Sequence, residues 1–519
     1  MAFFNGWPFT QFQEQNLDWL IRQVKANTVA INNMKDNISD IMDEWLQDGT
    51  IQALVQDSLD TKLFWTPDLL HIDFTPAEGD LVLTGGYNTE GDRGSGLYIV
   101  NQVDGLSVNG LRYMPIYAQS SLALGIVADG VTDNTQAIRD AIGWVDHIDF
   151  LPDDVVMLSG SVPLQDDLTL NGNGCMIAAG VNSIGSGSYM LYGTGRKNIK
   201  IKDIVFNRQS STNDFYAISL PNSDGIVIDG CEFINGTGYM CRLSGNTHLR
   251  VTNCKASAIV GIVGNPGGLF YIQGGSDIFF DNIYTTDIED HAIYIDGSVE
   301  SHHINIQNVI AKDYKIATAL TAAAVVVLYG NTHDFLIQGI IADNVKTGIS
   351  LNVRNNKIPY AGMVTDCNIS NTNANGIESI GNANTVAIET NNVIQNNNLI
   401  NIGQDGIDIR YQKKITVQNN HIENAYRWGI GSRQIEDSVY NNNMITGSEQ
   451  GMTLGSSGTP VIGSVISNNL AMNCNYGIRL VVAIDTGNYL CNNMEINVTN
   501  PTASHPAGNY ESKPTFTPT

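Results

Sequence analysis

The sequence predicts an all-β protein whose main part is a parallel β-helix, and two short repeated phrases carry this prediction. The first phrase alternates apolar and polar residues and ends in Asn, Asp or Gly, as in 226–230 (IVIDG), 249–253 (LRVTN) and 415–419 (ITVQN). The second phrase begins with Gly-Ile and alternates in the same way, as in 348–351 (GISL) and 406–409 (GIDI). Both recur about every 22–31 residues, which is the range of solenoid repeats. Because the two series interleave in phase, we expect a stack of about a dozen coils.

Each copy of either phrase has the period of a β-strand. Alternation places one set of side chains inward and the other outward. A short strand cannot bury its apolar face alone, whereas stacked copies form a continuous core and pair their backbones with the coils above and below. Asn, Asp and Gly at the strand ends fit corners that require positive φ, and stacked Asn side chains can form amide ladders.

Composition narrows the possible partners and compartments. The chain has 519 residues, of which 42% are hydrophobic and 15% charged, and its formal net charge is −25. This acidity argues against nucleic acid and anionic membranes as partners. No segment is apolar over a length that spans a bilayer, and residues 1–30 lack the basic and apolar parts of a signal peptide. We therefore expect assembly in a cytoplasm, without membrane insertion.

The seven cysteines predict neither a disulfide framework nor a metal site. Cys231, Cys254 and Cys367 occupy a coil position that Ile283 and Val309 fill elsewhere, so we interpret them as small core residues. No CxxC occurs, and no His spacing matches a known zinc site. We expect no metal and no cofactor.

We divide the chain into an N-terminal helical segment (1–62), a small β head or linker domain (63–120), the β-helix with a capping helix at its start (121–498) and a short tail (499–519). The head domain is predicted from the strands 81–86 and 96–100, which flank a Gly-rich turn.

The N-terminal segment has a heptad pattern. Val24, Ile31 and Ile38 fall seven apart on one seam, and Asn27 and Ile41 lie on the other. Isoleucine on both seams favours a three-stranded coiled coil whose register one buried Asn can fix. The alternative is a single amphipathic helix that packs on its own chain.

The β-helix is predicted to begin with a capping helix. In 125–142 (GIVADGVTDNTQAIRDAI), Asp133 or Asn134 is expected to cap a helix whose apolar face includes Ile138 and Ile142. Such a helix would cover the open end of the solenoid, since terminal coils need special ends.

At this point a family resemblance becomes specific. Residues 125–142, followed by 150–152 (FLP) and 168–174 (LTLNGNG), resemble the entry sequence of the pectate-lyase-like superfamily of right-handed β-helices. Residues 78–80 and 91–100 resemble the head domain of bacteriophage tailspikes and tail appendages. Residues 8–12 and 16–20 resemble the virion-attachment segment of tail proteins in short-tailed phages of Gram-positive and gut bacteria.

The resemblance implies a homotrimeric tailspike of the virion tail that is assembled in the host cytoplasm and binds or cleaves a host surface glycan. Its N-terminus would dock on phage tail or portal-proximal virion proteins. Many tailspikes carry a C-terminal trimerisation or carbohydrate-binding domain, for which the segment 499–519 has no room. Trimer formation would then fall to the N-terminal coiled coil and its flanks.

A catalytic site is predicted from the outward positions of the second phrase. Alignment of its copies places Glu378 and Asp408 on adjacent coils, with strands about 4.8 Å apart. Two carboxylates about 5–5.5 Å apart suit a retaining glycosidase, whereas a pair separated by a skipped coil would suit an inverting one. Arg410, Arg433 and Arg354 lie near the pair, where they would keep one carboxylate ionised or bind an acidic sugar. The alternative is a solvated ladder of stacked acids with structural arginines.

A second candidate lies on the N-terminal side. Asp290, His291 and Asp296, with Glu300 and the nearby His302, His303 and His333, predict an acidic and imidazole patch that could supply a base or a general acid. The alternative is that these His residues only form hydrogen bonds at coil corners. The aromatic residues predicted to stack on sugar rings are Tyr294 and Trp428, and further candidates are Tyr329, Tyr411 and Tyr426.

We therefore predict a phage tailspike that binds host surface polysaccharide and hydrolyses it with paired carboxylates. A non-enzymatic receptor-binding or structural tail appendage is the alternative, and a polysaccharide lyase is the third possibility. The fold alone does not separate an enzyme from a binding protein.

Overall fold

The structure is a computed structural model, and its described residues fall into two units, within 1–118 and 119–519. They are 63–72, 74–87, 95–101, 103, 105–108, 111–117, 120–180, 184–185, 187–208, 215–261, 267–314, 323–382, 387–455, 460–481, 487–500 and 510–512. The predicted coiled coil and virion-attachment segment (1–62) lie outside them, so both stay predictions.

The first unit contains a five-stranded sheet. Its strands are β1 (Leu63–Thr66), β2 (Leu81–Thr84), β3 (Gly96–Asn101), β4 (Leu106–Val108) and β5 (Leu111–Tyr117), in the order β1-β2-β3-β5-β4. The β1–β2 pair is parallel, and the other pairs are antiparallel. This sheet lies within 63–120, where the sequence predicts a small β domain, and the role of that domain as a linker stays a prediction.

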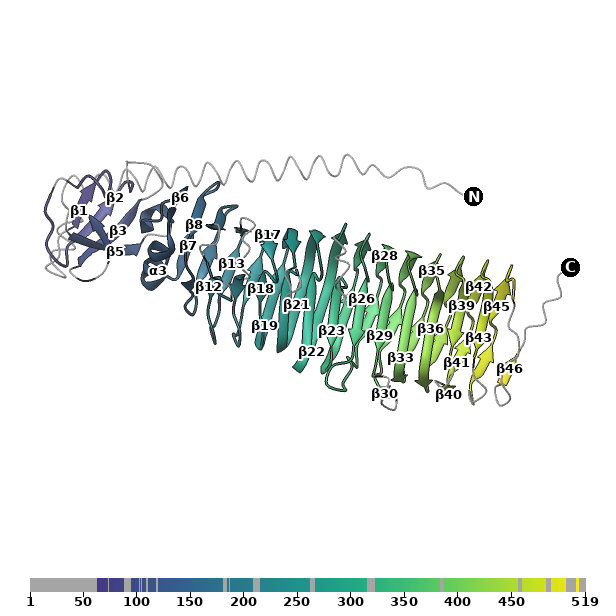
Figure 1. Ribbon diagram of the computed structural model, residues 1–519. Coiled ribbons are helices and arrows are strands. Elements are labelled where there is room, and N and C mark those ends of the chain that lie inside the picture. Colours follow the sequence, from purple (N-terminus) through teal and green to yellow (C-terminus); the bar gives the residue numbers. More distant parts are fainter. Residues whose placement is uncertain are drawn as a thin grey trace, which may run out of the picture. The chain divides into compact units, whose positions relative to one another are not determined.

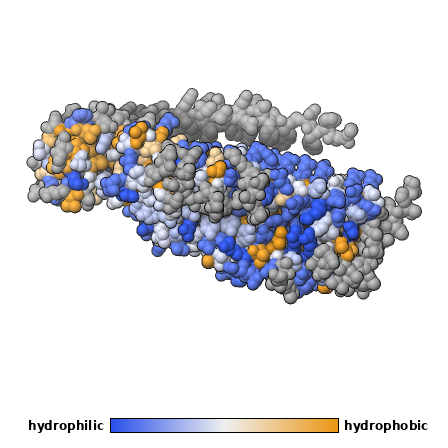
Figure 2. All heavy atoms as spheres, in the orientation of Figure 1, coloured by the Kyte–Doolittle hydropathy of each residue, from blue (hydrophilic) through white to orange (hydrophobic). Residues whose placement is uncertain are grey.

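The second unit is a parallel β-helix of about 13 turns, as the sequence predicts. Figure 1 shows its coils following one another along a single axis from β7 to β45. Each full coil contributes one strand, or one part of a long strand, to each of three stacks, and all pairings between coils are parallel. The face seen in Figure 2 is mostly hydrophilic, because the apolar side chains of the strands point into the core.

The first stack consists of the strands that carry the first repeated phrase. It runs through β7 (His147–Asp149), β10 (Thr169–Asn171), β13 (Lys200–Lys202), β16 (Val227–Asp229), β19 (Asn246–Thr252), the middle of β21 (Phe270–Ile288) and of β22 (Ile293–Lys312), β24 (Thr332–Gln338), β27 (Met363–Thr365), β31 (Val393–Gln395), β34 (Thr416–Gln418), β37 (Val439–Asn441), β41 (Val465–Ser467), β44 (Tyr489–Cys491) and β46 (Tyr510–Ser512).

The second stack follows after one corner of each coil. It runs through β6 (Asp129–Asp133), β8 (Val155–Leu158), β11 (Met176–Ala179), β14 (Val205–Asn207), β17 (Glu232–Thr237), β20 (Lys255–Val260), the ends of β21 and β22, β25 (Ile341–Asp343), β28 (Asn368–Thr372), β32 (Asn398–Ile402), β35 (His421–Glu423), β38 (Met444–Thr446), β42 (Leu470–Met472) and β45 (Met494–Ile496).

The third stack carries the second repeated phrase and the candidate site. It runs through β9 (Val162–Pro163), β12 (Tyr189–Tyr192), β15 (Tyr216–Ser219), β18 (Cys241–Arg242), the starts of β21 and β22, β23 (Val326–Tyr329), β26 (Ile349–Asn352), β29 (Ile377–Ile380), β33 (Ile407–Lys413), β36 (Trp428–Glu436), β39 (Gln450–Leu454) and β43 (Tyr476–Leu480). The short strands β30 (Ile388–Glu389) and β40 (Val461–Ile462) pair with the ends of β33 and β36.

The corner between the first two stacks explains the Asn residues of the repeat. Asn419, Asn442 and Asn468 end copies of the first phrase, and all three have φ near +55°. The asparagine that follows each of them points inward: Asn420 Nδ2 lies 2.9 Å from Asn443 Oδ1, which belongs to the next coil. The same contact continues along a buried ladder of Asn397, Asn420, Asn443, Asn469 and Asn493. The amide contacts predicted for the strand-end asparagines also occur, since Asn442 Nδ2 donates to Asn419 Oδ1 at 2.9 Å. The inward ladder at the next position was not predicted.

The predicted helix at the start of the β-helix is present as α3 (Thr135–Trp144), which packs against β7 and β9. Its N-terminus differs from the prediction of a single capping residue, because Asp133 and Asn134 have separate roles there. Asn134 is the N-cap residue, but its side chain bonds to Val127, while the Asp133 carboxylate accepts the Thr135 N–H. A 3-10 turn, η1 (Leu122–Leu124), precedes it.

Candidate functional site

The outward face of the third stack gathers most of the predicted site residues. In β29 the side chains of Ile377 and Ser379 point inward, so Glu378 points outward, and β33 repeats this alternation. Register pairing joins these outward positions into two parallel rows, which we call the outward strip. One row contains Tyr271, Tyr294, Ser350, Glu378 and Asp408, and the other contains Asp296, Tyr329, Asn352, Arg410 and Arg433.

The glycine of the second phrase allows these coils to approach closely. A Cβ on Gly376 would lie 2.7 Å from the Gly406 carbonyl oxygen, and one on Gly406 would lie 2.5 Å from that of Gly429. Neither distance is open to a side chain. Glycine at this position therefore brings adjacent strands together just before the outward strip begins.

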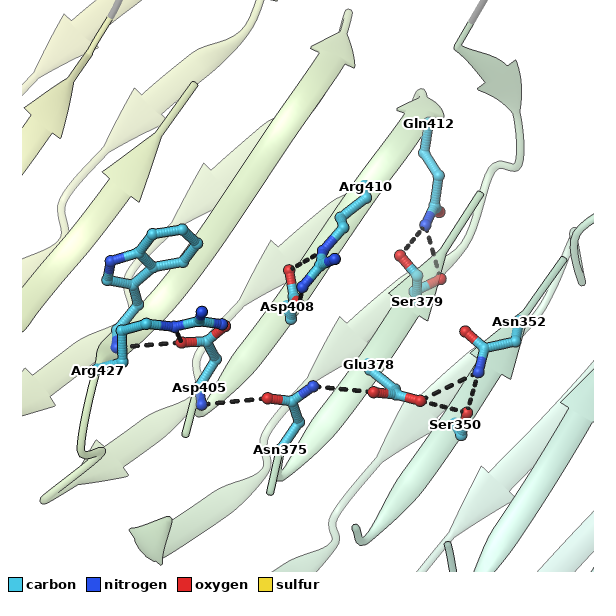
Figure 3. A network of polar contacts seen from close by, with 11 residues as sticks. Ser350, Asn352, Asn375, Glu378, Ser379, Asp405, Asp408, Arg410, Gln412 and Arg427 are labelled. Carbon is cyan, nitrogen blue, oxygen red and sulfur yellow. Dashed lines mark hydrogen bonds and ion pairs between the residues drawn. The ribbon is translucent and has the colours of Figure 1, made fainter. Parts of the chain in front are cut away.

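Glu378 is a half-buried carboxylate held by neutral donors. Its Oε1 accepts from Ser350 Oγ at 2.7 Å and from Asn352 Nδ2 at 3.1 Å, and its Oε2 accepts from Asn375 Nδ2 at 2.8 Å. Figure 3 shows these contacts continuing through Asn375 to the backbone of Asp405. Three donors, two on one oxygen and one on the other, fix the orientation of the carboxylate.

Asp408 is the register partner of Glu378, as the sequence predicts, but its surroundings differ. Its side chain is 0% exposed, and both of its oxygens accept from the Arg410 guanidinium, with 3.0 Å between Arg410 Nε and Asp408 Oδ1. The predicted cation beside the pair is thus committed to Asp408 itself. This arrangement fits a structural ion pair better than a nucleophile that faces solvent.

A second ion pair of the same kind was not predicted. Asp405, which precedes Asp408 on its coil, is fully buried and bound through both oxygens by Arg427. Burial raises the pKa of Asp405, against the lowering effect of Arg427. In the sequence, Asn375 and Asp405 each directly precede the glycine of the second phrase. This common position is the only signal that could have indicated Asp405.

Trp428 is not the open stacking platform that the sequence suggests. Its ring packs over Gly431, where a Cβ would lie 2.1 Å from Trp428 Cε3. The guanidinium carbons of Arg427 and Arg433 lie 4.5 Å and 4.6 Å from the ring centroid. The aromatic face is therefore engaged by two cations of the same chain.

Tyrosines form a better aromatic surface at the other end of the outward strip. The rings of Tyr271 and Tyr294 stack with their centroids 5.6 Å apart, and Tyr329 lies 5.5 Å from Tyr294. All three are partly exposed. Tyr271 was missed as a candidate, although it precedes Tyr294 by one coil at the same offset.

Arg354 ties these tyrosines to Asp296. Its Nη1 lies 2.9 Å from Asp296 Oδ2 and 3.1 Å from the Tyr294 hydroxyl. Tyr271 donates its hydroxyl hydrogen to Asp296 at 3.2 Å, and burial, together with the Asp296 charge, raises the pKa of Tyr271 to about 12. Asp296 lies three strand spacings from Glu378, about 14 Å along the stack. That exceeds the separation of about 6.5–9.5 Å between paired carboxylates in inverting glycosidases, so these two do not form a catalytic pair.

Asp290 and His291 form a buried pair without net charge. Asp290 Oδ2 lies 3.1 Å from His291 Nε2, and His291 Nδ1 lies 2.8 Å from the Ala324 carbonyl. Burial raises the pKa of Asp290 to about 7 and lowers the pKa of His291 to about 4. The neutral imidazole therefore donates from Nδ1 to the Ala324 carbonyl and lies with Nε2 beside the neutral Asp290 carboxyl.

The two opposite shifts balance in their effect on stability. The raised pKa of Asp290 gives stability that is lost as pH rises from 3.8 toward 7, and the lowered pKa of His291 gives stability that is lost as pH falls from 6.5 toward 4. Between about pH 4 and 6.5 the pair holds one proton in both the folded and the unfolded chain. Its contribution is therefore nearly independent of pH there.

The remaining histidines do not belong to this pair, which corrects the single patch expected from the sequence. His302 stacks on His333 of the next coil at 5.3 Å, and His333 lies 2.9 Å from Glu300. His303 lies 3.2 Å from Asp277 and has φ of 53°, as a corner residue does. No contact joins this corner to His291 among the described residues.

In the described part of the chain, no group of three or more His, Cys, Asp and Glu side chains is placed to hold a metal ion. No helix within the same ranges is long and apolar enough to cross a membrane. The cysteines described are free, and all except Cys491 are buried, as predicted for Cys231, Cys254 and Cys367.

Comparisons with known proteins establish the fold. Residues 347–509 match the family model of the right handed beta helix region. The tailspike of Escherichia coli bacteriophage HK620, solved in complex with a pentasaccharide, is 13% identical with a TM-score of 0.56, over 72% of this chain and 76% of that one. No curated protein matches the sequence. The chain therefore has the right-handed parallel β-helix fold, which is found in bacteriophage tailspikes.

Two other solved structures are similar at lower TM-scores. Tailspike protein 3 of bacteriophage CBA120 is 11% identical with a TM-score of 0.47, over 80% of this chain, which spans 64% of that protein. The A-module of a mannuronan C-5 epimerase from Azotobacter vinelandii is 14% identical with a TM-score of 0.40, over 76% of this chain and 98% of the module.

Proposed function

We propose that this protein is a phage tailspike that binds a host cell-surface polysaccharide along the outward strip. The observation that carries the proposal is the strip itself, where partly exposed tyrosines and hydrogen-bonding groups repeat across adjacent coils. Stacked aromatic rings bind the apolar faces of sugars, while fixed polar groups bind their hydroxyls. The HK620 tailspike, whose structure was solved with a pentasaccharide, has the same fold.

The proposal has parts that rest on the sequence resemblance. A homotrimer, held by the helical segment 1–62 and docked on tail or portal-proximal virion proteins, is the form that the heptads and the attachment-like residues favour. Assembly would take place in the host cytoplasm. Analytical ultracentrifugation of the full chain tests the homotrimer, and a chain that sediments as a monomer would contradict it.

Hydrolysis of the bound glycan is the second candidate function, and the register of Glu378 opposite Asp408 favours it. Glu378 is oriented by three donors and partly exposed, so it is the better placed of the two to act as an acid or base. Asp408 would act from a fixed position, since Arg410 holds both of its oxygens. Binding without cleavage requires none of this and has the stronger support.

A lyase that uses the His291 patch has the weakest support. The imidazole is buried, its pKa is lowered to about 4 by burial, and both nitrogens already have partners. A base for β-elimination needs a free lone pair within reach of the sugar. Neither Asp290 nor His291 offers one within reach, because both side chains are buried.

The test incubates purified full-length protein with capsule and wall polysaccharides from the suspected hosts. Binding is measured by surface plasmon resonance, reducing ends by colorimetry, and unsaturated uronate by absorbance. Hydrolysis predicts reducing ends alone, reduced by about 10²–10⁴-fold in Glu378→Gln. Glu423→Gln is the matched control, because Glu423 is a half-buried glutamate on the second stack.

The outcomes separate the candidates. Binding with no new ends leaves a receptor-binding protein and removes the hydrolase. Unsaturated products would support the lyase and contradict the assignment of Glu378. Absence of binding to any host glycan would contradict the proposed function as a whole.

A further inference from the structure

Arginines concentrate at the third stack in the C-terminal half of the chain. The arginines that follow Arg250 in the sequence are Arg354, Arg410, Arg427, Arg433 and Arg479, and each lies in a strand of this stack or next to one. The chain as a whole has a net charge of −25. Five arginines close together on an acidic protein create a local site for negative charge.

Internal carboxylates account for three of these five cations. Arg354 binds Asp296, Arg410 binds Asp408, and Arg427 binds Asp405. Arg479 has a weaker contact, with 3.4 Å between its Nη1 and Gln450 Oε1, and its guanidinium lies over the Tyr476 ring.

Arg433 has no such partner. Among the described residues, no carboxylate or other acceptor lies within hydrogen-bonding distance of its guanidinium, and its Nε is buried. Its register neighbour on the preceding coil is Arg410, so two guanidinium groups rise from adjacent strands. Burial and the nearby Arg410 charge lower the pKa of Arg433, against the opposing effect of the Asp408 and Asp405 charges.

A second unpartnered donor lies beside it. Trp428 Nε1 is buried and, within the described ranges, finds no acceptor. The Trp428 ring lies 4.6 Å from the Arg433 guanidinium carbon. Buried donors are nearly always paired, so two orphaned donors on side chains that contact each other indicate a missing acceptor.

We propose that Arg433, supported by Arg410 and Trp428 Nε1, forms a subsite for an anionic substituent of the bound glycan: a carboxylate, sulfate or phosphate. The inference rests on the proposed glycan binding and adds the chemical class of the ligand. A planar guanidinium fork and an indole N–H both donate to oxyanions, and the adjacent arginine adds charge. The arginines that pair with Asp296, Asp408 and Asp405 stabilise the strip. Arg433 is the arginine that can bind the ligand directly.

The test uses immobilised oligosaccharides in pairs that share a backbone and differ by one carboxylate, sulfate or phosphate. Wild type is expected to bind at least one acidic member about tenfold more tightly than its neutral partner, the size of one charge-assisted contact. Arg433→Met is expected to abolish this difference. Arg250→Met is the matched control, because Arg250 also lies over an aromatic ring (Phe279, 4.6 Å) but on the first stack.

Four results are possible. A preference for the acidic member that persists in Arg433→Met overturns the assignment of the subsite to Arg433. Preference for one acid over the others, lost in Arg433→Met and kept in Arg250→Met, supports the subsite and identifies its anion. Equal binding of acidic and neutral members by wild type overturns the subsite while the glycan-binding function stands. Failure of wild type to bind any glycan, including those of the host, overturns both.

A measurement on wild type alone guards against a variant that does not fold. The preference for the acidic member is expected to shrink as sodium chloride rises from 0.05 to about 0.5 M, because salt screens the contact. A preference that does not change with salt would contradict an anion subsite even if Arg433→Met could not be purified.

Discussion

Replacing Asn397 with alanine tests how the coils are held together, because it removes one rung of the buried amide ladder. Asn397 is 1% exposed. Its Oδ1 accepts from the Cys367 N–H at 3.0 Å, and its Nδ2 donates to the Val364 carbonyl at 3.3 Å and to Asn420 Oδ1 at 2.9 Å. In the variant the Cys367 N–H stays buried without this acceptor.

The magnitude follows from these contacts. An orphaned buried amide costs about 1–3 kcal/mol, and each of the other two lost hydrogen bonds contributes about 0.5–1.5 kcal/mol. We therefore expect Asn397→Ala to lower the free energy of unfolding by about 2–6 kcal/mol.

The neighbouring residue is the matched control. Asn398 points outward and is half-buried, and its amide contacts Asn368 at 3.2 Å and His421 at 2.8 Å. Water can replace both contacts, so Asn398→Ala is expected to change the free energy of unfolding by about 0.5 kcal/mol or less.

Urea unfolding of both variants, followed by circular dichroism, measures the difference. Hydrogen exchange of the peptide that contains Cys367 measures it locally, and exchange there should accelerate in Asn397→Ala alone. Equal effects of the two substitutions would refute the reasoning, because they would show that the inward ladder adds nothing beyond an outward hydrogen bond.

Three further predictions concern the outward strip and its surroundings. Asp408→Asn leaves Arg410 without its carboxylate and should lower the free energy of unfolding in urea by about 2–4 kcal/mol. The control Asp366→Asn changes an exposed corner residue of the first stack and should lower it little. Equal losses would show that the Asp408 ion pair is not structural. Asp290→Asn removes the raised pKa of the pair and leaves the lowered pKa of His291. The stability of the variant should therefore fall as pH decreases from 6.5 to about 4, while that of wild type stays nearly constant. Parallel stability–pH curves would contradict the two opposing shifts. Tyr294→Ala should weaken binding of the host polysaccharide about tenfold in surface plasmon resonance. The control Tyr284→Ala changes a tyrosine that is exposed on the second stack and should leave binding unchanged. An equal loss in both variants would argue against binding along the outward strip.

Much of the fold could be predicted because it is written in local repeats. Alternation gives the strands, the Gly-Ile and Asn-terminated phrases give the phase of the coils, and both are short-range signals. The same register placed Glu378 opposite Asp408, which the structure confirms. The helix over Thr135–Trp144 followed from its capping residues and its apolar face.

The partners of each site residue could not be predicted in the same way. Register says which residues are neighbours but not which way a long side chain turns. Arg410 turns back onto Asp408 of its own strand, and the Trp428 ring folds over Gly431. Neither is therefore the open binding group that the sequence suggested, and in the proposed anion subsite Arg410 adds only charge and Trp428 only its Nε1 hydrogen. His291 was grouped with His302 and His303 by proximity in sequence, yet β22 passes a corner between them.

The measurement that tests the central claim most directly is a structure of the full-length protein with an oligosaccharide prepared from the host's surface polysaccharide. The account predicts sugar rings against Tyr271 and Tyr294, with the chain of sugars extending along the third stack toward Glu378 and Arg433. Sugar bound to the first or second stack, or to the sheet of the first unit, would contradict it.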